Sequence, residues 1–226
     1  MTDRLSGSDG LPAPSQPETA STSPDEGRLN LDMSTYLETP RLILRQFTAD
    51  DLDSLVSLDA DPAVMHFITA GVPTSRDELA SDYIPAYLAY YERGNRWGFW
   101  VAEEKDTGRF LGWFHLRPHA GDPEDEPELG YRLIAAAWGQ GYATEGSVAL
   151  IDKAFTQLGA QRVYAHTMAM HTASRRVMEK AGLQLVRTFK ADWPIRIEGD
   201  EQGDVEYALT LKEWVAMRPR PNVGLS

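Results

Sequence analysis

A glycine-containing turn between a predicted strand and a predicted helix constrains this chain more than any other feature. The stretch AAAWGQGYATEG, residues 135–146, follows the strand-like segment PELGYRLIA and leads into an apolar helical pattern. Glycines at positions 139 and 141 let the backbone approach a ligand closely. A helix N-terminus directs backbone N–H groups and a partial positive charge toward one point. The arrangement therefore indicates an anion site held by backbone groups, with the Thr144 hydroxyl as a further donor.

Two familiar phosphate-binding motifs do not match this turn. A Walker A loop requires G-x-x-x-x-G-K-[ST], and the segment has neither that spacing nor the lysine. A dinucleotide-binding fold requires G-x-G-x-x-G near a first strand, whereas G-x-G-x-A lies here late in the chain. A tight turn that binds nothing stays open as the alternative.

Composition and charge narrow the class of protein. The 226 residues are 42% hydrophobic, and no apolar run approaches the roughly 18 residues that a membrane span needs. The net charge of -12 disfavours a nucleic-acid surface, which requires a basic face. The absence of cysteine excludes disulfides, thiolate nucleophiles and Cys-ligated metals. Since the N-terminus has no apolar signal region, we expect a cytoplasmic enzyme with no nucleic-acid or membrane partner.

A change in composition near residue 36 divides the chain. Residues 1–35 contain no aromatic residue and are rich in Ser, Thr, Pro, Gly and Asp, which predicts a disordered N-terminal tail. A regulatory or docking tail is the alternative. We expect residues 36–217 to form one domain and residues 218–226 to form a C-terminal tail.

Periodicity within residues 36–217 predicts the element order β-α-α-β-β-β-α-β-α-β-β. The first strand is RLILRQFT at 41–48, and the first helix ends at Asp61-Pro62. Two β-rich runs, RWGFWVAEE and RFLGWFHLRP, flank the turn KDTG and predict a hairpin. After the glycine turn come a helix, the strand RVYAHTM, the helix TASRRVMEKAG and a closing antiparallel ribbon. The order describes one α/β domain with a mixed, mostly antiparallel sheet.

One long segment and three shorter ones resemble a known family. LGYRLIAAAWGQGYATEGSVALIDKAF resembles the acyl-CoA pyrophosphate motif of the GNAT superfamily of N-acetyltransferases, most closely its ribosomal-protein N-acetyltransferase (Rim-like) branch. LETPRLILRQFTADDLDSL, TASRRVMEKAGL and GDVEYALTLKEW resemble further parts of that branch in the same order, over about residues 36–217. The resemblance implies a single GNAT-like domain in which two splayed parallel strands, flanked by helices, clamp acetyl-CoA.

The resemblance also implies a set of cofactor-binding residues. Pantetheine would pair with the backbone at Leu133, and the pyrophosphate would lie on the N–H groups of the turn, namely Trp138, Gly139, Gln140, Gly141, Tyr142, Ala143 and Thr144. Trp138 stands where the superfamily usually has Arg or Gln, so a side-chain phosphate donor is missing there. Packing on the sheet is the alternative role for Trp138 and Tyr142.

Two residues of the helix that follows the second splayed strand extend this set. His171 stands where the family usually places Asn, which puts the usual hydrogen bond in doubt and adds a titratable group beside the site. Arg175 is a candidate for contact with CoA phosphates, with a solvated helix face as the alternative.

The implied chemistry is attack of an amine on a thioester carbonyl, which requires a base, an oxyanion donor and an acid. Glu128 is the first candidate base, with an exposed residue of an acidic strand as the alternative. His115 is the second, with a core or rim histidine as the alternative. The resemblance implies that Ser174 protonates the CoA thiolate, with a helix N-cap role as the alternative. We expect no metal site, because His115 and His119 have no carboxylate or third histidine in useful register.

The resemblance implies that the acceptor is a primary amine, either of a small molecule or of a protein N-terminus. It also implies an acceptor pocket made by the first two helices and the ribbon before the last strand. Aromatic and acidic residues there suit a cationic amine, unless the acidity only solubilises the surface: Phe67, Tyr83, Trp97, Trp193, Glu198, Asp200 and Asp204. Three further possibilities stay open. The domain could bind acyl-CoA as a non-catalytic sensor, it could transfer a longer acyl chain that lies near Trp113 and His166, and it could form a homodimer.

Overall fold

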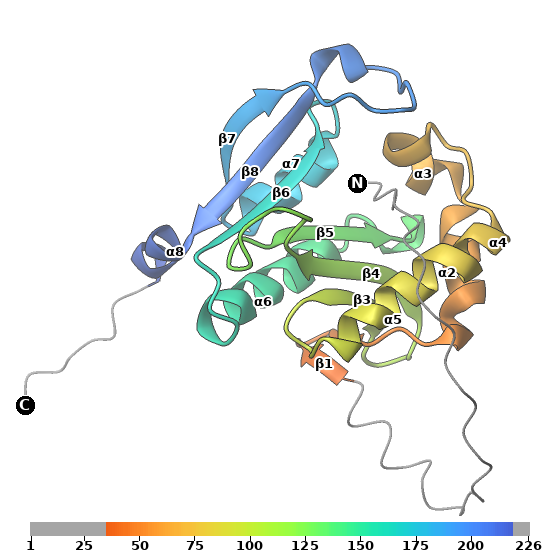
Figure 1. Ribbon diagram of the computed structural model, residues 1–226, viewed down its shortest axis with the longest axis horizontal. Coiled ribbons are helices and arrows are strands. Elements are labelled where there is room, and N and C mark those ends of the chain that lie inside the picture. Colours follow the sequence, from red (N-terminus) through yellow and green to blue (C-terminus); the bar gives the residue numbers. More distant parts are fainter. Residues whose placement is uncertain (1–34, 219–226) are drawn as a thin grey trace, which may run out of the picture.

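A single mixed sheet runs through the computed structural model, which describes residues 35–218 (Figure 1). Its eight strands have the order β1-β2-β3-β4-β5-β6-β8-β7, and every neighbouring pair is antiparallel except β5 and β6. The strands are β1 (Thr35–Glu38), β2 (Leu42–Arg45), β3 (Gly98–Glu104), β4 (Phe110–Arg117), β5 (Glu128–Leu133), β6 (Arg162–Met168), β7 (Gln184–Phe189) and β8 (Asp204–Thr210). The predicted mixed, mostly antiparallel sheet is confirmed.

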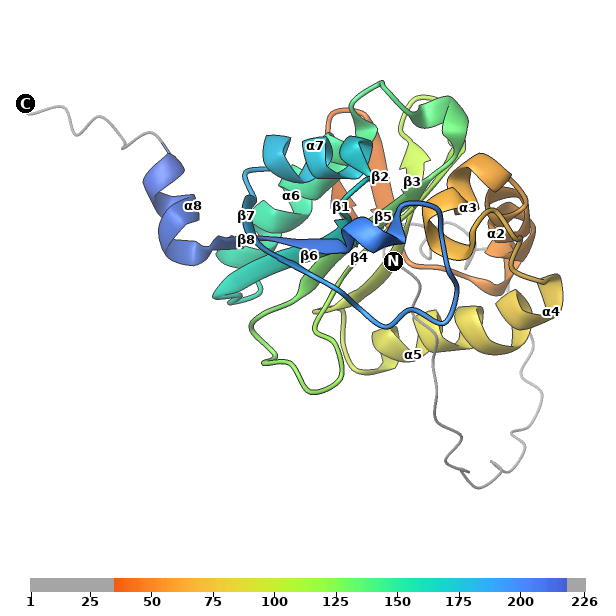
Figure 2. The same cartoon turned by 90° about the horizontal axis from the view of Figure 1, so that it is seen from above.

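Helices cover both faces of this sheet (Figure 2). One face packs against α6 and α7, and the other against α2 and α5. The α-helices are α2 (Leu52–Asp59), α3 (Pro62–Thr69), α4 (Arg76–Glu78), α5 (Ile84–Glu92), α6 (Tyr142–Thr156), α7 (Thr172–Lys180) and α8 (Leu211–Met217). No helix in the stretch from 35 to 218 has both the length and the apolar content to cross a bilayer.

Alternation along β4 divides the core between the two faces. Phe114 and Leu116 belong to the cluster beneath α6, whereas Trp113 belongs to the cluster beneath α2 and α5. Helix α6 approaches β4 closely because Gly146 has no side chain: a Cβ there would lie 2.4 Å from Phe114 Cζ. This close packing fixes the position of the N-terminus of α6, where the glycine turn ends.

The two central strands diverge from a single point of pairing. Strands β5 and β6 run parallel, and in the part of the chain that the structure describes they pair at Glu128 and Tyr164 alone. Beyond that pair the two halves of the sheet separate, with β1 to β5 on one side and β6 to β8 on the other (Figure 1). The expected splayed parallel strands are therefore confirmed.

Two elements escaped the prediction from sequence. Strand β1 is only four residues long, and it is defined by its pairing with β2. Helix α3 begins where a helix end was expected, because Asp61 accepts a hydrogen bond from Ala63 N (2.9 Å) as an N-cap and Pro62 occupies the first helical position. The predicted tails lie almost wholly outside the described residues, apart from Thr35 at the start of β1 and Arg218.

Candidate active site

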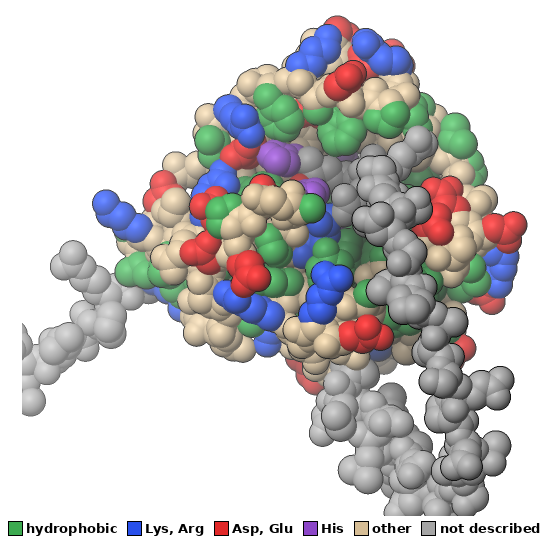
Figure 3. Space-filling model, in the orientation of Figure 1, with side chains coloured by type: hydrophobic (Ala, Val, Ile, Leu, Met, Phe, Trp, Pro, Cys, Tyr) green, Lys and Arg blue, Asp and Glu red, His purple; other side chains and the backbone are tan. Residues whose placement is uncertain are grey.

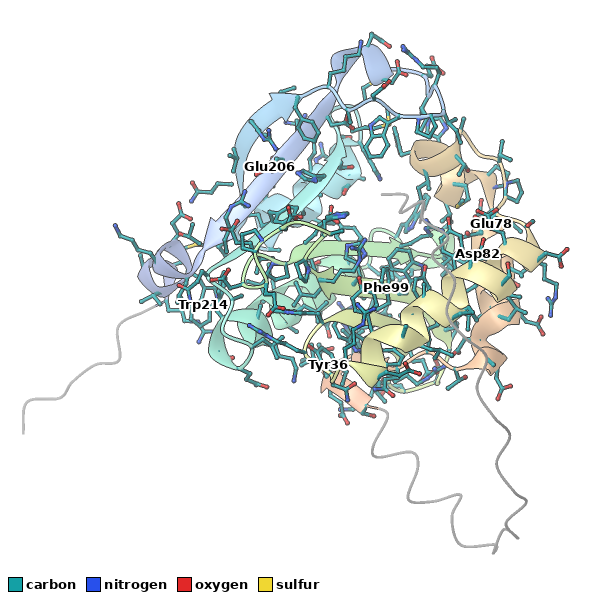
Figure 4. The ribbon with its side chains drawn as sticks, in the orientation of Figure 1. Tyr36, Glu78, Asp82, Phe99, Glu206 and Trp214 are labelled. Atoms are coloured by element: carbon teal, nitrogen blue, oxygen red, sulfur yellow. The ribbon has the colours of Figure 1, made fainter. Side chains whose placement is uncertain are left out.

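A cleft of about 1350 Å³ opens where β5 and β6 diverge. Its walls include the glycine turn, the N-terminus of α7, helix α3 and parts of the segment 189–197. Figure 3 shows hydrophobic and histidine side chains in the hollow between the two halves of the molecule. Figure 4 labels Phe99, which lines the cleft, in the lower half of the molecule and Glu206 on β8 in the upper half. The cleft thus joins the first turn of α6 to the point where the strands meet.

The glycine turn presents backbone donors to this cleft. Gly139 and Gly141 have φ values of +72° and +87°, which a residue with a side chain rarely adopts. Gly141 is the N-cap of α6, and within residues 35–218 no side chain caps the helix there. The first-turn residues Ala143 and Thr144 line the cleft. Because the first amides of a helix have no intrahelical acceptor, they can bind an anion at this point.

The sequence analysis missed an ion pair between Arg41 and Glu145, which holds the glycine turn in place through the Gln140 carbonyl. Arg41 Nε donates to Glu145 Oε2 (2.7 Å), and Arg41 Nη1 donates to the Gln140 carbonyl (3.0 Å). Glu145 Oε1 in turn accepts from Thr39 Oγ1 (2.6 Å). Tyr142 points into the fold, where its hydroxyl donates to Glu104 Oε1 (2.5 Å), so the geometry favours the packing role for its side chain.

Trp138 and Leu133 meet at the end of β5. The half-exposed Trp138 indole donates from Nε1 to the Leu133 carbonyl (2.9 Å). Ile134 N donates to Leu111 O across the sheet (2.9 Å), so the Leu133 N–H, one residue earlier, points to the opposite side, toward β6. The backbone at Leu133 therefore faces the gap between the splayed strands.

Glu128 lies at the centre of a histidine cluster. Its side chain is fully buried, and its carboxylate contacts His119 Nε2, His115 Nε2 (3.5 Å) and His166 Nδ1 (3.5 Å). Burial raises the pKa of Glu128, but the contacts with the three histidines outweigh it and hold the pKa well below its usual range. The alternative of an exposed acidic residue is therefore wrong.

The histidine cluster around Glu128 shows that one argument used against a metal site, the lack of a carboxylate and a third histidine near His115 and His119, was wrong. Glu128 and His166 supply the carboxylate and third histidine that the sequence was said to lack. Between residues 35 and 218, however, no three such side chains are arranged so that they could hold a metal ion.

His115 is packed as a core residue. Its side chain is 3% exposed, and its ring lies over Gly130, where a Cβ would come within 2.5 Å of Nε2. Trp113 and Phe99 pack around the same ring at centroid distances of 5.8 and 5.1 Å. Burial lowers the pKa of His115, so the ring is neutral. This environment favours the core-histidine alternative over a base role.

Ser174 and Tyr131 meet on the opposite face of β5 from Glu128. Ser174 is nearly buried in α7, and the Tyr131 hydroxyl lies 3.1 Å from both its carbonyl oxygen and its Oγ. Burial raises the pKa of Tyr131, so the phenol stays protonated. Sequence reasoning missed Tyr131, although the period of two in ELGYRL places it on the face away from Glu128.

The GNAT acetyltransferase domain model matches residues 41–184 of this chain. The chain belongs to the GNAT acetyltransferase family. It is 34% identical over 189 residues to the FsC-acetyl coenzyme A-N(2)-transacetylase of Aspergillus fumigatus, covering 80% of this chain and 79% of the relative. The enzyme class expected from the sequence, an acetyltransferase, is confirmed.

Two solved acetyltransferase structures share the fold at low identity. RimL, a ribosomal L7/L12 alpha-N-protein acetyltransferase in complex with coenzyme A, aligns with a TM-score of 0.65 at 18% identity, covering 77% of this chain and 97% of RimL. Spermidine N-acetyltransferase from Vibrio cholerae, in complex with CoA and spermine, aligns with a TM-score of 0.62 at 18% identity, covering 78% and 99%.

The residues present fit acetyl-CoA, the co-substrate of GNAT acetyltransferases. A pyrophosphate suits the uncapped amides of α6. The amide groups of the pantetheine arm would pair with the backbone at Leu133, which faces the gap between β5 and β6.

Of the two predicted cofactor-binding residues on α7, His171 lines the cleft and Arg175 does not. His171, the N-cap of α7, lines the cleft and stacks on Phe67 with ring centroids 4.1 Å apart. Arg175 instead donates from Nε to the Tyr207 hydroxyl (3.1 Å) and from Nη1 to the Ala169 carbonyl (2.9 Å). Its neighbour Arg176 lines the cleft, so α7 presents Arg176 there in place of Arg175.

The residues expected around the GNAT acceptor divide into two groups. Phe67, Tyr83, Trp193 and Asp204 line the cleft, together with Glu78. The other three are elsewhere: Trp97 packs against the core, Asp200 pairs with Arg196, and Glu198 is an exposed residue outside the lining. The acceptor side of the cleft is therefore aromatic with a few carboxylates.

Replacing His171 should change how stability depends on pH. Burial lowers the pKa of His171 from 6.5 to about 4. Between these values the unfolded chain binds a proton that the folded protein does not, so this contribution to stability is present above pH 6.5 and is lost toward pH 4. We expect the melting temperature of the wild type to fall relative to His171→Asn as the pH drops from 7 to 4.5. Parallel pH curves for the two proteins would contradict this assignment.

Proposed function

We propose that this GNAT protein transfers an acetyl group from acetyl-CoA to a primary amine by direct attack, as a member of the Rim-like branch. The observation that carries the proposal is the cleft that links the uncapped amides of α6 to the buried Glu128 cluster. The similarity to an enzyme named as an acetyl-CoA N-transacetylase supports it.

Glu128 lies on one face of β5, and Tyr131, which contacts the proposed acid Ser174, lies on the other. Glu128 and Tyr131 lie an odd number of residues apart in an extended strand, so their side chains point to opposite faces. We infer that the amine approaches on the Glu128 face and attacks the thioester carbonyl. A backbone N–H near Leu133 stabilises the oxyanion, and much of the rate comes from positioning the two substrates.

The leaving thiolate takes its proton on the other face. The C–S bond breaks as the C–N bond forms, and the Ser174 hydroxyl donates a proton to sulfur. The Tyr131 hydroxyl, which lies 3.1 Å from Ser174 Oγ, holds that side chain in place. Tyr131 thus acts as a positioning residue.

The acceptor is a small-molecule amine or a protein N-terminus. The carboxylates of Glu78 and Asp204 and the aromatic lining of the cleft favour a cationic amine. The two named structural neighbours act on these two kinds of acceptor, a ribosomal protein and spermidine. The relatives named above do not favour the alternative of a non-catalytic acyl-CoA-binding module. A cytoplasmic location and a homodimer stay predictions.

Acetylation of a panel of amines and N-terminal peptides, followed by release of free CoA thiol, tests the proposal. We expect Ser174→Ala to lower kcat about tenfold to hundredfold without changing the affinity for acetyl-CoA, because the serine acts only as the thiolate leaves. Ser57→Ala, at an exposed position of α2, is the matched control. Binding of acetyl-CoA by calorimetry with no turnover of any amine would contradict the proposed function.

A further inference from the structure

We propose that the acceptor of this enzyme is a small primary monoamine with an aromatic body, which packs on an aromatic wall of the cleft while its amine lies beside Glu128. This inference rests on the proposed acetyl transfer and narrows the class of acceptor. We define the aromatic wall by the rings of Tyr87, Tyr90, Phe99 and Trp113, all of which line the cleft.

The rings of the aromatic wall form one continuous surface around Phe99, which Figure 4 labels. The Phe99 ring stacks on Tyr87 at a centroid distance of 4.1 Å and meets Tyr90 and Trp113 edge-on at 5.6 and 5.8 Å. Tyr87, Phe99 and Trp113 come from α5, β3 and β4 and are buried. Because three elements hold these rings, the wall is formed before a ligand binds. Such a surface suits another aromatic ring, which stacks or packs edge-on.

The aromatic wall begins at the point of reaction. The Phe99 ring meets the His115 ring edge-on at 5.1 Å, and His115 Nε2 lies 3.5 Å from Glu128 Oε2. Trp113 is paired directly with Arg132 across β4 and β5, so their side chains share a face of the sheet. Glu128 shares that face too, because it is an even number of residues from Arg132 in the same strand. An amine at Glu128 therefore has the aromatic wall beside its substituent.

The charges of the cleft suit an acceptor with a single ammonium group. Within residues 35–218, the carboxylates that line the cleft are Glu78, Glu128, Asp192 and Asp204. Asp204 is buried, and its Oδ2 already accepts from Trp193 Nε1 (2.9 Å) and Ala191 N (3.3 Å). Glu78 and Asp192 are exposed. A polyamine on the aromatic wall would place further charges among neutral rings, where an unpaired charge is costly.

Apolar side chains and a closed sheet bound the space in front of the aromatic wall. Helix α3 contributes Phe67 and Ile68 to the cleft, and the segment 189–197 contributes Trp193. Phe67 stacks on His171 at 4.1 Å, so α3 and α7 meet at one side of the cleft. Among the described residues, β3, β4 and β5 pair with one another along the wall, so it offers no free strand edge to a peptide backbone. The space therefore suits the body of a small molecule.

The reaction balances with acetyl-CoA as the second reactant. The amine nitrogen bonds to the thioester carbonyl carbon and the C–S bond breaks. The amine loses one proton, the CoA sulfur gains one, and the products are the N-acetylated aromatic amine and the CoA thiol. The aromatic wall takes no part in these bonds. It positions the amine, so its effect is expected in kcat/KM for the acceptor.

Initial rates with matched amines test the class of acceptor. 2-Phenylethylamine and ethylamine differ only by the ring, whereas spermidine and an alanine-initiated tetrapeptide represent polyamines and protein N-termini. We expect kcat/KM for 2-phenylethylamine to exceed each of the other three values by about tenfold or more, because a single buried methylene already discriminates by about tenfold.

Ala86→Glu tests whether the aromatic wall faces the acceptor. Ala86 precedes Tyr87 on α5, lines the cleft and is half-buried. Glutamate is a good helix former, so the melting temperature and the calorimetric affinity for acetyl-CoA should not change. We expect kcat/KM to fall about tenfold for 2-phenylethylamine and to rise for spermidine, whose further ammonium groups gain a carboxylate. Ala86→Gln is the matched control, since it has nearly the same shape without the charge, and it should shift the ratio of the two amines much less.

Each outcome has one meaning. The preference for the ring, together with the charge-dependent change in Ala86→Glu, supports the proposal. A wild type that acetylates ethylamine, spermidine or the peptide as well as 2-phenylethylamine overturns it and leaves acetyl transfer intact. Equal amine ratios in the two Ala86 variants also overturn it, because the aromatic wall would then not face the acceptor. A wild type that binds acetyl-CoA but acetylates no amine overturns the proposed function as well.

Discussion

Thr144→Asp is expected to weaken acetyl-CoA binding several-hundredfold while the protein stays folded. Thr144 lies in the uncapped first turn of α6 and lines the cleft, so a carboxylate there would face the pyrophosphate. Two unit charges about 4 Å apart interact by roughly 1 kcal/mol in water and about 4 kcal/mol at an effective dielectric constant near 20. Because a negative charge also stabilises a helix N-terminus, the melting temperature should not fall.

Thr144→Asn is the matched control, since it has nearly the same shape without the charge. Calorimetric titration with acetyl-CoA should give an affinity within a few-fold of the wild type for this variant. Added salt should recover part of the affinity of Thr144→Asp, because the repulsion is partly exposed. Equal affinity of the aspartate and asparagine variants would mean that the pyrophosphate lies elsewhere.

Asp59→Ala is expected to lower the free energy of unfolding by about 3 to 5 kcal/mol, the usual cost of leaving a buried charge unpaired. Asp59 is fully buried and accepts from Arg132 Nη1 (2.5 Å) and Thr74 Oγ1 (2.6 Å). The Arg132 guanidinium lies over the Trp113 ring at 5.1 Å and is 8% exposed. Removal of Asp59 therefore leaves a cation in an apolar layer between α2 and β5.

Urea unfolding measures this effect, and two variants separate its causes. The double variant Asp59→Leu/Arg132→Met should recover most of the stability, because it removes both charges and keeps the volume filled. Asp53→Ala, which removes an exposed partner of Arg76, should change stability little. A stable Asp59→Ala protein would mean that the buried pair contributes nothing net.

Local patterns predicted most of the elements because their signals lie within one segment. The strand RVYAHTM coincides with β6, and the glycine turn leads into α6 as expected. Asp61-Pro62 shows the limit of such patterns, since an Asx–Pro pair can follow one helix and begin the next. Strand β1 could not be predicted from four residues, because a strand of that length depends on its partner.

Only those site residues that are close together in the sequence could be predicted. The turn that binds an anion is encoded by consecutive residues, and so is the serine on α7. The histidine cluster is not, because the pairing of β5 with β6 brings His166 to Glu128 from 38 positions away. Similarly, the Arg41–Glu145 pair joins residues 104 positions apart. No spacing in the sequence identifies which distant side chains a sheet will bring together.

The single pairing point between β5 and β6 gives the sheet a seam. Each half is held by antiparallel ladders, whereas in the described residues β5 and β6 share one bridge, and side-chain contacts such as those around Glu128 and between Tyr131 and Ser174 join the two halves. A ligand arm lying in the seam would replace the hydrogen bonds that a continuous ladder would have made. A substrate bound in this gap would therefore bridge the two halves of the sheet at the place where their own backbones do not pair.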